Sequence, residues 1–574
     1  EVDGGGSVTN GVGGAIGAAR GNVTLVGRDV NQNGRVSATS AVGRNGSIRL
    51  LARDNVVTAT TSNGIPTVQA TRTGALVLGE GSVTEVVPER DSAATSRDDV
   101  AFDKSTVELV GRTVHLKQDA AVLAAGGVVD ITAQDGQFFE TATQARQSDV
   151  RVQLDPGARI DVAGLRDVDV PVERNVLQIE LRGDELKDAP LQRQGVLRNK
   201  TVFVDAREGT SLLDISPFLG QVERTVAERS APGGEIRIRS EGDVVLRAGA
   251  SLDVSGGSIR YGDGILNTTK LISDRGLVDI SDASPDVLYR GIAGIYETTD
   301  AKWGVTRRYQ TLPGTLVQGY LEGKDAGTIR VLGHRLVLDA DLRGKVVTGP
   351  LQVGAGTLPQ GGRLVLGDAA QTNASNPDFL LPSVRFTARP PILPADFTFM
   401  TGLEPTPLPA QWEEGLTLDP QRLSDGGFSR LEVYSNGRIE VDTPLSLAAG
   451  GALRLAGREL DIRQDIVLPA GSIRLSTHDA FARTPTEQAA ASDVQRHGLR
   501  LADGVSLRAR GLWSNALLSP AGGELILPDG GTVTLSSVAD LTLGSGSLID
   551  VTGGGQVDPD GRLEGGKGGS ISLS

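Results

Sequence analysis

Residues 246–256 read LRAGASLDVSG, and two other stretches of the chain repeat this pattern. Residues 154–164 read LDPGARIDVAG and residues 543–553 read LGSGSLIDVTG, so all three fit the frame L-x-x-G-[AS]-x-[IL]-D-V-x-G. The copies at 246–256 and 543–553 belong to a longer shared frame of about 25 residues, in which glycine pairs and two aspartates fall in register. A recurring unit of strand, turn, strand, turn and strand predicts a solenoid.

Short alternating strands, each ending in a Gly or Asn/Asp turn, recur along the chain. Residues 46–50 and 471–475 both read GSIRL, and residues 234–238 read GEIRI. Because side chains alternate across a strand, Ile48 and Leu50 are expected to point inward while Ser47 and Arg49 face solvent. The 76 glycines suit frequent turns, and the scarcity of aromatic residues indicates a core of Val, Leu, Ile and Ala.

These patterns predict an all-β fold, a parallel β-helix in which coils stack about 4.8 Å apart and pair their backbone groups. We expect one solenoid over residues 1–574 with long loop insertions. The segments expected to leave the rod are about 84–104, 166–232, 258–325 (rich in Tyr and Trp), 350–430 (rich in Pro) and 478–500.

Charge and composition exclude several classes of protein. The net charge of −14 and the lack of a Lys/Arg run argue against nucleic-acid binding. Without cysteine the chain has no disulfide, thiolate or Cys-based metal site. No apolar run reaches the roughly 18 residues that a transmembrane segment needs. The chain starts without Met or a signal segment and stops within a strand-like SISLS, so we expect a fragment of a longer protein.

Asp161, Asp253 and Asp550 occupy one position of the repeated frame. They could be carboxylates of a polysaccharide-cleaving enzyme, or they could cap their own turns by accepting backbone hydrogen bonds. Because the copies lie far apart in the sequence, we expect them to be several coils apart and unable to form an acid/base pair. The turn-capping interpretation is therefore preferred.

Residues 29–34 read DVNQNG, which matches the first half of a calcium loop. Asp29, Asn31 and Asn33 are therefore candidate metal ligands, although Ser40 stands where the loop would place its Glu. Asn-Gly is also an ordinary tight turn. The histidines are scattered without metal spacing, at His115, His334, His478 and His497. No G-x-S-x-G elbow or phosphate loop occurs, and we expect no catalytic residue and no cofactor.

The segment 258–325 holds most of the tyrosines and one tryptophan. Its Trp303, Arg307, Arg308, Tyr309 and Tyr320 are candidate ligand-binding residues, because aromatic rings stack on sugars and dominate protein interfaces. The alternative is that a long insertion needs a small core of its own.

Several motifs resemble the filamentous haemagglutinin family. They are the Gly-Gly-x-[IV]-x-[IL] strands, the [IL]-Asp-Val-[AST]-Gly turns, GGKGGSISL at 565–573, AKWGVTR at 301–307 and GYLEGKDAG at 319–327. The resemblance implies a right-handed parallel β-helix, export by two-partner secretion through a TpsB-type outer-membrane transporter, and a place on or near the bacterial cell surface. Members of the family serve as adhesins, so cell-surface glycans or proteins of host or bacterial cells are the expected partners.

Three functions remain open from the sequence. The preferred hypothesis is an adhesive rod that mediates attachment and catalyses no reaction. The second is a passive stalk for a toxin or receptor-binding tip. The third, a β-helical polysaccharide lyase or hydrolase, requires Asp and Arg or Lys side chains that converge on one face of neighbouring coils.

Overall fold

The computed structural model shows an all-β architecture, as predicted, and in the part of the chain that it describes the helices are short. It describes residues 6–60, 66–134, 149–300, 303–310, 314–355, 357–368, 383–401, 404–413, 415–478, 498–515, 517, 525–558 and 560–574.

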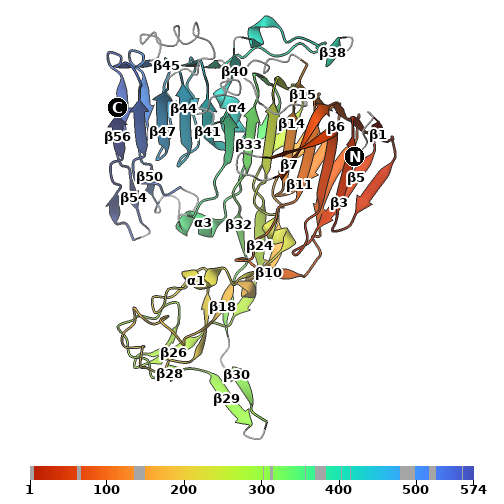
Figure 1. The fold of residues 1–574 in the computed structure, drawn as a ribbon. Helices are drawn as coiled ribbons and strands as arrows, with labels where there is room; N and C mark the ends of the chain where they lie inside the picture. Colours follow the sequence, from red (N-terminus) through yellow and green to blue (C-terminus); the bar gives the residue numbers. More distant parts are fainter. Residues whose placement is uncertain are drawn as a thin grey trace.

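Three long sheets of parallel strands dominate the structure (Figure 1). The first contains β1 (Ser7–Asn10), β4 (Asp29–Gln32), β8 (Ala75–Leu78), β12 (Thr113–Leu116), β15 (Arg151–Leu154), β22 (Asp243–Leu246) and β34 (Arg335–Leu338). The second contains β2 (Ala15–Ala18), β5 (Arg35–Ser40), β9 (Val83–Pro88), β13 (Ala121–Ala124), β16 (Arg159–Asp161), β23 (Ser251–Asp253) and β35 (Asp341–Arg343). The third contains β3 (Asn22–Gly27), β6 (Ser47–Thr60), β11 (Thr106–Gly111), β14 (Val128–Ala133), β21 (Glu235–Ser240), β33 (Thr328–Leu332), β36 (Gly362–Leu366), β41 (Phe428–Tyr434), β44 (Ala452–Gly457), β47 (Ser472–Thr477), β51 (Thr532–Ser536) and β56 (Ser570–Leu573), and β7 (Pro66–Thr73) adds to β6 in the antiparallel sense.

The chain visits the three sheets in turn and then stacks its next strands on the previous ones. Strands β21, β22 and β23 follow one another in sequence, and each pairs in parallel with the corresponding strand β33, β34 or β35. This is the strand, turn, strand, turn, strand unit that the repeated frame predicts. The first and last strands lie at opposite ends of this stack (Figure 1).

In the C-terminal half, two shorter parallel sheets accompany the third long sheet. One contains β40 (Leu416–Leu418), β37 (Val384–Phe386), β42 (Arg438–Val441), β45 (Glu459–Ile462), β48 (Leu499–Leu501) and β52 (Leu541–Leu543). The other contains β43 (Leu445–Ser446), β46 (Ile466–Val467), β49 (Ser506–Arg508) and β53 (Leu548–Asp550). The second long sheet ends at β35, and helix α4 (Pro420–Asp425) contacts both β35 and β43. Helix α4 thus lies between the last strand of the second long sheet and the first strand of the shorter sheet that begins with β43.

The inward-facing aliphatic side chains form one continuous core from Val23 to Leu535. Ile48 and Leu50 are fully buried, as their alternation predicts. Burying such a side chain contributes about 1.5–3 kcal/mol relative to leaving it exposed. Because neighbouring coils share this core, each coil depends on the next.

Glycines stack from coil to coil beside the third sheet. A Cβ atom on Gly234 would collide with the carbonyl oxygen of Gly127, and one on Gly327 would collide with that of Gly234. Gly569 stands in the same relation to Gly531. These stacked glycines therefore mark places where backbones approach too closely for any side chain.

A lobe projects from the side of the stack (Figure 1). It comprises the described parts of residues 176–222 and 264–317 and has a separate core that includes Ile179, Leu212 and Leu271. Its elements are β18 (Val176–Glu180), β19 (Thr201–Asp205), α1 (Ser216–Leu219), β25 (Gly264–Leu266), β26 (Lys270–Ser273), β27 (Gly276–Asp279), β28 (Gly291–Ile292), β29 (Ile295–Asp300), β30 (Val305–Gln310) and β31 (Thr315–Val317). The two segments form one body although part of the stack separates them in sequence.

Stacked aromatic rings lie where the lobe joins the stack. The rings of Tyr261 and Tyr320 lie 4.5 Å apart, and the guanidinium of Arg207 lies 4.9 Å from the centre of the Tyr320 ring. The surrounding elements are β10 (Thr95–Arg97), β17 (Val168–Pro171), η1 (Val172–Asn175), β20 (Glu223–Thr225), α2 (Val226–Arg229), β24 (Ser258–Gly262) and β32 (Tyr320–Gly323). Such packing can hold the lobe in a fixed direction.

A strap, defined as the described part of residues 390–412, crosses the outer face of the first sheet. Its Phe397 and Trp412 pack on Val245 and Val337 of that sheet. The strap contains β38 (Met400–Thr401), β39 (Glu404–Pro405) and η4 (Ala410–Trp412). The remaining elements are α3 (Pro350–Ala355), β50 (Trp513–Asn515), β54 (Gly555–Val557) and β55 (Leu563–Gly565). Across the described ranges, no helix has the length and apolar character needed to cross a membrane.

Candidate functional site

Trp303 lies in the turn of the hairpin formed by β29 and β30, which extends from the lobe (Figure 1). Its side chain is 72% exposed. The next residue, Gly304, has a φ of +64°, a left-handed conformation that suits a tight turn. The hairpin therefore presents a large aromatic surface to solvent, away from the stack.

The other predicted binding residues fall into two groups. Arg307, Arg308 and Tyr309 lie on β30 of the same hairpin, where their backbones pair with residues of β29. The contacts of these three side chains lie outside the described part of the structure. Tyr320 lies on β32 at the base of the lobe, not in the hairpin, and its hydroxyl accepts a hydrogen bond from Asn175 Nδ2 at 3.1 Å.

Tyr320 therefore has a packing role at the base of the lobe. Its ring stacks on Tyr261, and burial raises its pKa above the usual value. The cluster that Tyr320 packs against includes Val170 and Ala231 from outside the segment 258–325, and Trp303 stays a candidate for binding.

The candidate calcium ligands lie on an extended strand and the turn after it. Asp29 and Asn31 belong to β4, and Asn33 follows the strand. Asp29 Oδ1 accepts a hydrogen bond from the backbone N–H of Ala75 at 2.9 Å. Within the described residues, no group of three or more His, Asp or Glu side chains is placed to hold a metal ion.

The repeated aspartates cap their own turns, as predicted. Asp161 Oδ1 accepts from Ala163 N at 2.9 Å, Asp253 Oδ1 from Ser255 N at 2.8 Å, and Asp550 Oδ1 from Thr552 N at 3.0 Å.

The expectation that these aspartates lie several coils apart is wrong for one pair. Asp161 on β16 stands directly opposite Asp253 on β23, and Asp253 stands opposite Arg343 on β35. The two aspartates occupy neighbouring coils because much of the intervening sequence leaves the stack to form part of the lobe. The three side chains thus form a row of two carboxylates and one guanidinium across adjacent strands.

This row lines a cleft of about 720 Å³, a usual size for a ligand site. The cleft forms where α4 contacts β35, the last strand of the second sheet. The backbone N–H of Gly344, after β35, donates to the carbonyl oxygen of Gly426, after α4, at 2.7 Å, and this bond joins the two walls of the cleft. Its lining consists of Asp161, Ala163, Arg166, Asp253, Ser255, Leu338, Ala340, Asp341, Leu342, Arg343, Lys345, Leu418, Arg422, Leu423, Asp425 and Gly426.

The surroundings of the Asp161 carboxyl in the cleft make its charged form less favourable than in water. Burial, with a further contribution from the nearby Asp253 carboxylate, raises the pKa of Asp161, and the hydrogen bond from Ala163 opposes the rise. Arg422 is used structurally, because its Nη2 donates to the carbonyl oxygens of Asp339 at 2.7 Å and Ala340 at 3.0 Å. Arg343 and Lys345 remain exposed at the mouth of the cleft.

Sequence reasoning missed Arg343, Lys345 and the α4 side of the cleft. The only local signal is an imperfect copy of the repeated frame at residues 336–344, LVLDADLRG, in which Arg343 takes the place of the aspartate. The position of α4 beside β35 depends on how the segment after β36 folds, and the repeated frame does not predict it.

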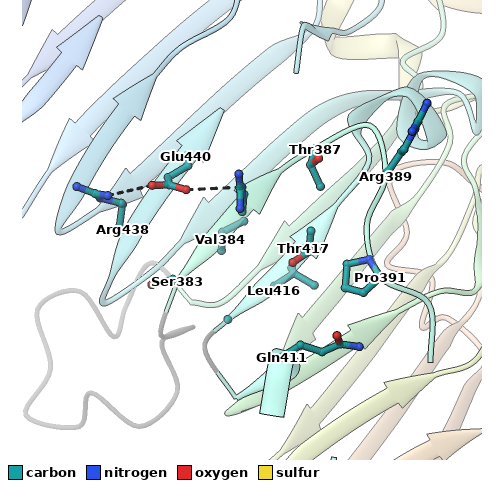
Figure 2. Close-up of a pocket in the computed structure, with 12 residues that line it drawn as sticks. Ser383, Val384, Thr387, Arg389, Pro391, Gln411, Leu416, Thr417, Arg438 and Glu440 are labelled. Carbon is teal, nitrogen blue, oxygen red and sulfur yellow. Dashed lines mark hydrogen bonds and ion pairs between the residues drawn. The ribbon is translucent and has the colours of Figure 1, made fainter. Parts of the chain in front are cut away.

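A second cavity, of about 560 Å³, lies over β37, β40 and β42 (Figure 2). Figure 2 shows the Glu440 side chain beside that of Arg438. The Glu440 carboxylate lies 3.0 Å from the guanidinium of Arg438 and 3.7 Å from that of Arg385. Arg385 also pairs with Asp442 at 2.5 Å. Because most of its cationic charge is matched by carboxylates, this cavity is a weaker candidate for a charged ligand than its arginines alone suggest.

The described histidines serve packing. His115 lies 2.6 Å from Asp155 and stacks on Phe399 of the strap with ring centres 4.0 Å apart. His478 Nε2 lies 3.0 Å from the carbonyl oxygen of Ser435. His334 lies between β33 and β34 and is partly buried, and His497 lies outside the described residues.

Comparison of the chain with protein-family models, curated proteins and solved structures yields no match in any of the three. The resemblance to filamentous haemagglutinins therefore stays a prediction from the motifs quoted above.

Proposed function

We propose that this chain is a structural and adhesive rod of a secreted, surface-associated bacterial exoprotein, built as a right-handed parallel β-helix. The stacked sheets support the helical part of the proposal, since in the N-terminal half, up to β36, successive coils contribute one strand to each of the three long sheets. The right-handed sense, the cell-surface location and export through a TpsB-type transporter rest on the family resemblance. The absence of cysteine suits export of an unfolded chain, because no disulfide can close a loop.

The single observation that carries adhesion is the position of Trp303. A lobe with its own hydrophobic core holds a hairpin away from the stack, and the turn of that hairpin exposes the indole by 72%. Large aromatic side chains dominate the energetics of protein interfaces and stack on sugar rings. A stiff scaffold also lowers the entropy that binding would cost a flexible loop.

The test compares two exposed tryptophans on the same chain. The purified protein, a Trp303→Ala variant and a Trp513→Ala variant are applied to a glycan array and to intact bacterial and animal cells. Trp513 lies on β50 in the C-terminal part of the stack and is 64% exposed, so it controls for the loss of an exposed indole. Unchanged β-rich circular dichroism confirms that each variant folds.

The proposal expects saturable binding that Trp303→Ala weakens at least tenfold and Trp513→Ala leaves within twofold. Saturable binding that both variants retain would place the adhesive surface elsewhere. No binding by the wild-type chain to any cell or glycan would favour the passive stalk and overturn the adhesive function of this chain.

A further inference from the structure

The cleft at the end of the second sheet offers a row of polar groups at a regular spacing. Asp161, Asp253 and Arg343 occupy paired positions on three adjacent parallel strands, which are about 4.8 Å apart. An extended saccharide chain advances by a similar distance per unit. Successive groups of the row could therefore meet successive units of such a chain.

The two carboxylates have hydrogen-bonding capacity left for a ligand. Each uses Oδ1 to accept the backbone N–H of its own turn, from Ala163 in one case and from Ser255 in the other. Within the described residues, neither Oδ2 atom has a hydrogen bond to another group. A carboxylate oxygen readily accepts a hydroxyl proton, and such charge-assisted bonds are stronger than those between neutral groups.

The rest of the lining suits an uncharged, hydroxyl-rich molecule. The cleft carries as many acidic as basic side chains, so it has no excess charge to recognise a strongly anionic or cationic ligand. Arg343 supplies donors next to the two acceptors. Leu342 and Leu418 add apolar surface to the lining, and such surface can contact the C–H face of a sugar ring.

We propose that this cleft binds a neutral saccharide chain, with Asp161 and Asp253 accepting hydrogen bonds from hydroxyl groups and Arg343 donating to them. The site lies on the stack itself and is independent of the hairpin that carries Trp303. It gives the rod a second point of attachment, so that binding at both sites would increase the overall affinity for a glycan-coated surface.

The test measures binding of the whole chain to neutral hexasaccharides by saturation-transfer NMR and calorimetry. The probes are hexamers of glucose in the α- and β-1,4 linkages, of mannose and of galactose, with hexagalacturonate as the charged comparison. The central variant is the double substitution Asp161→Asn with Asp253→Asn. Asparagine keeps the Oδ1 acceptor for each turn and removes the carboxylate, so the fold should be preserved.

Two matched controls locate the site. Asp550→Asn makes the same substitution in the third copy of the frame, whose capping bond resembles the other two. Trp303→Ala removes the hairpin indole. We expect at least one neutral hexamer to bind better than hexagalacturonate, with affinity at least tenfold lower in the double variant and unchanged within twofold in Asp550→Asn.

Three results would overturn the assignment. One is the absence of binding by every neutral hexamer at millimolar concentration. Another is equal affinity of the wild-type chain and the double variant. Loss of binding in Trp303→Ala alone would assign the saccharide to the hairpin instead of the cleft.

Discussion

Asp161 and Asp253 face each other across neighbouring parallel strands, although residues that form part of a projecting lobe separate them in the sequence. Each carboxylate also caps its own turn. The pairing joins two carboxylates in one cleft, where burial and, to a lesser extent, the charge of Asp253 raise the pKa of Asp161.

Replacing Asp161 by Asn is expected to stabilise the protein at pH 7. The folded state raises the pKa of Asp161 above its unfolded value of about 3.9. The contribution of this carboxyl to the free energy of unfolding is therefore complete below the unfolded pKa. It is lost as the pH rises through the folded pKa. Asparagine keeps the acceptor without the charge. The gain in free energy of unfolding, measured by denaturant titration, should therefore shrink as the pH falls towards 4.

Asp550→Asn is the control with the opposite sign. The hydrogen bond from Thr552 N lowers the pKa of Asp550. The Asp550 carboxylate therefore adds to the free energy of unfolding above its unfolded pKa, and this contribution is lost in acid. This variant should be destabilised at pH 7 and approach wild type in acid. A pH-independent effect of Asp161→Asn, or the same sign for both variants, would contradict the assigned electrostatics.

Replacing Asp243 by Asn should destabilise the stack strongly. Arg151 Nη2 lies 2.7 Å from Asp243 Oδ2, both side chains are fully buried, and Arg151 also donates to Thr406 O of the strap at 2.6 Å. Loss of the counter-ion leaves a buried guanidinium uncompensated, at a cost of about 3–5 kcal/mol. Asp169→Asn breaks an exposed pair with Arg260, which solvent screens, and should change the free energy of unfolding far less than Asp243→Asn does. Equal costs in chemical denaturation would show that burial of the Arg151 pair is energetically unimportant.

Leu212→Ala is expected to loosen the lobe without loosening the stack. Leu212 is fully buried in the separate lobe core, so its truncation should cost about 2–5 kcal/mol there. Hydrogen exchange should lose protection in β18, β19 and β26 while the third sheet keeps it. Leu364→Ala, in β36 of the stack, should give the reverse pattern. Loss of protection in both bodies from either change would mean that they unfold as one unit.

Gly327→Ala should disturb the register between coils. A Cβ atom at this position would meet the carbonyl oxygen of Gly234 in the preceding coil, and relieving the overlap should cost about 1–3 kcal/mol. Gly17→Ala adds the same atom on β2, where nothing lies within 4 Å, and serves as the comparison. A thermal midpoint for Gly327→Ala that equals that of Gly17→Ala would refute close coil packing at this glycine.

The sequence pattern predicted the local features of the stack because they depend on neighbouring residues. Ile48 and Leu50 alternate with polar side chains, and Asp253 precedes the turn that it caps. It did not predict which coils are adjacent, because that depends on how much sequence leaves the stack. For this reason the Asp161–Asp253 pair was expected to be far apart.

The sequence pattern also did not predict which side chains on the outer face of the stack are buried. All four residues of β15, from Arg151 to Leu154, are buried, since the strap covers the face that alternation assigns to solvent. The strap lies more than a hundred residues after β15 in the sequence, and the sequence of β15 itself does not indicate that the strap packs on it. Long-range coverage of this kind decides where charged groups such as Arg151 become buried.

If the lobe presents its hairpin for adhesion, a shortened hairpin should abolish binding. Ile295 and Gln310 are paired at its base, so a short Gly-Ser turn can join them and remove the residues between. The measurement is the binding isotherm of this variant on intact cells that bind the wild-type chain. Adhesion through the hairpin predicts that this variant loses saturable binding while its circular dichroism and thermal midpoint are unchanged. Undiminished affinity in the shortened protein would contradict it.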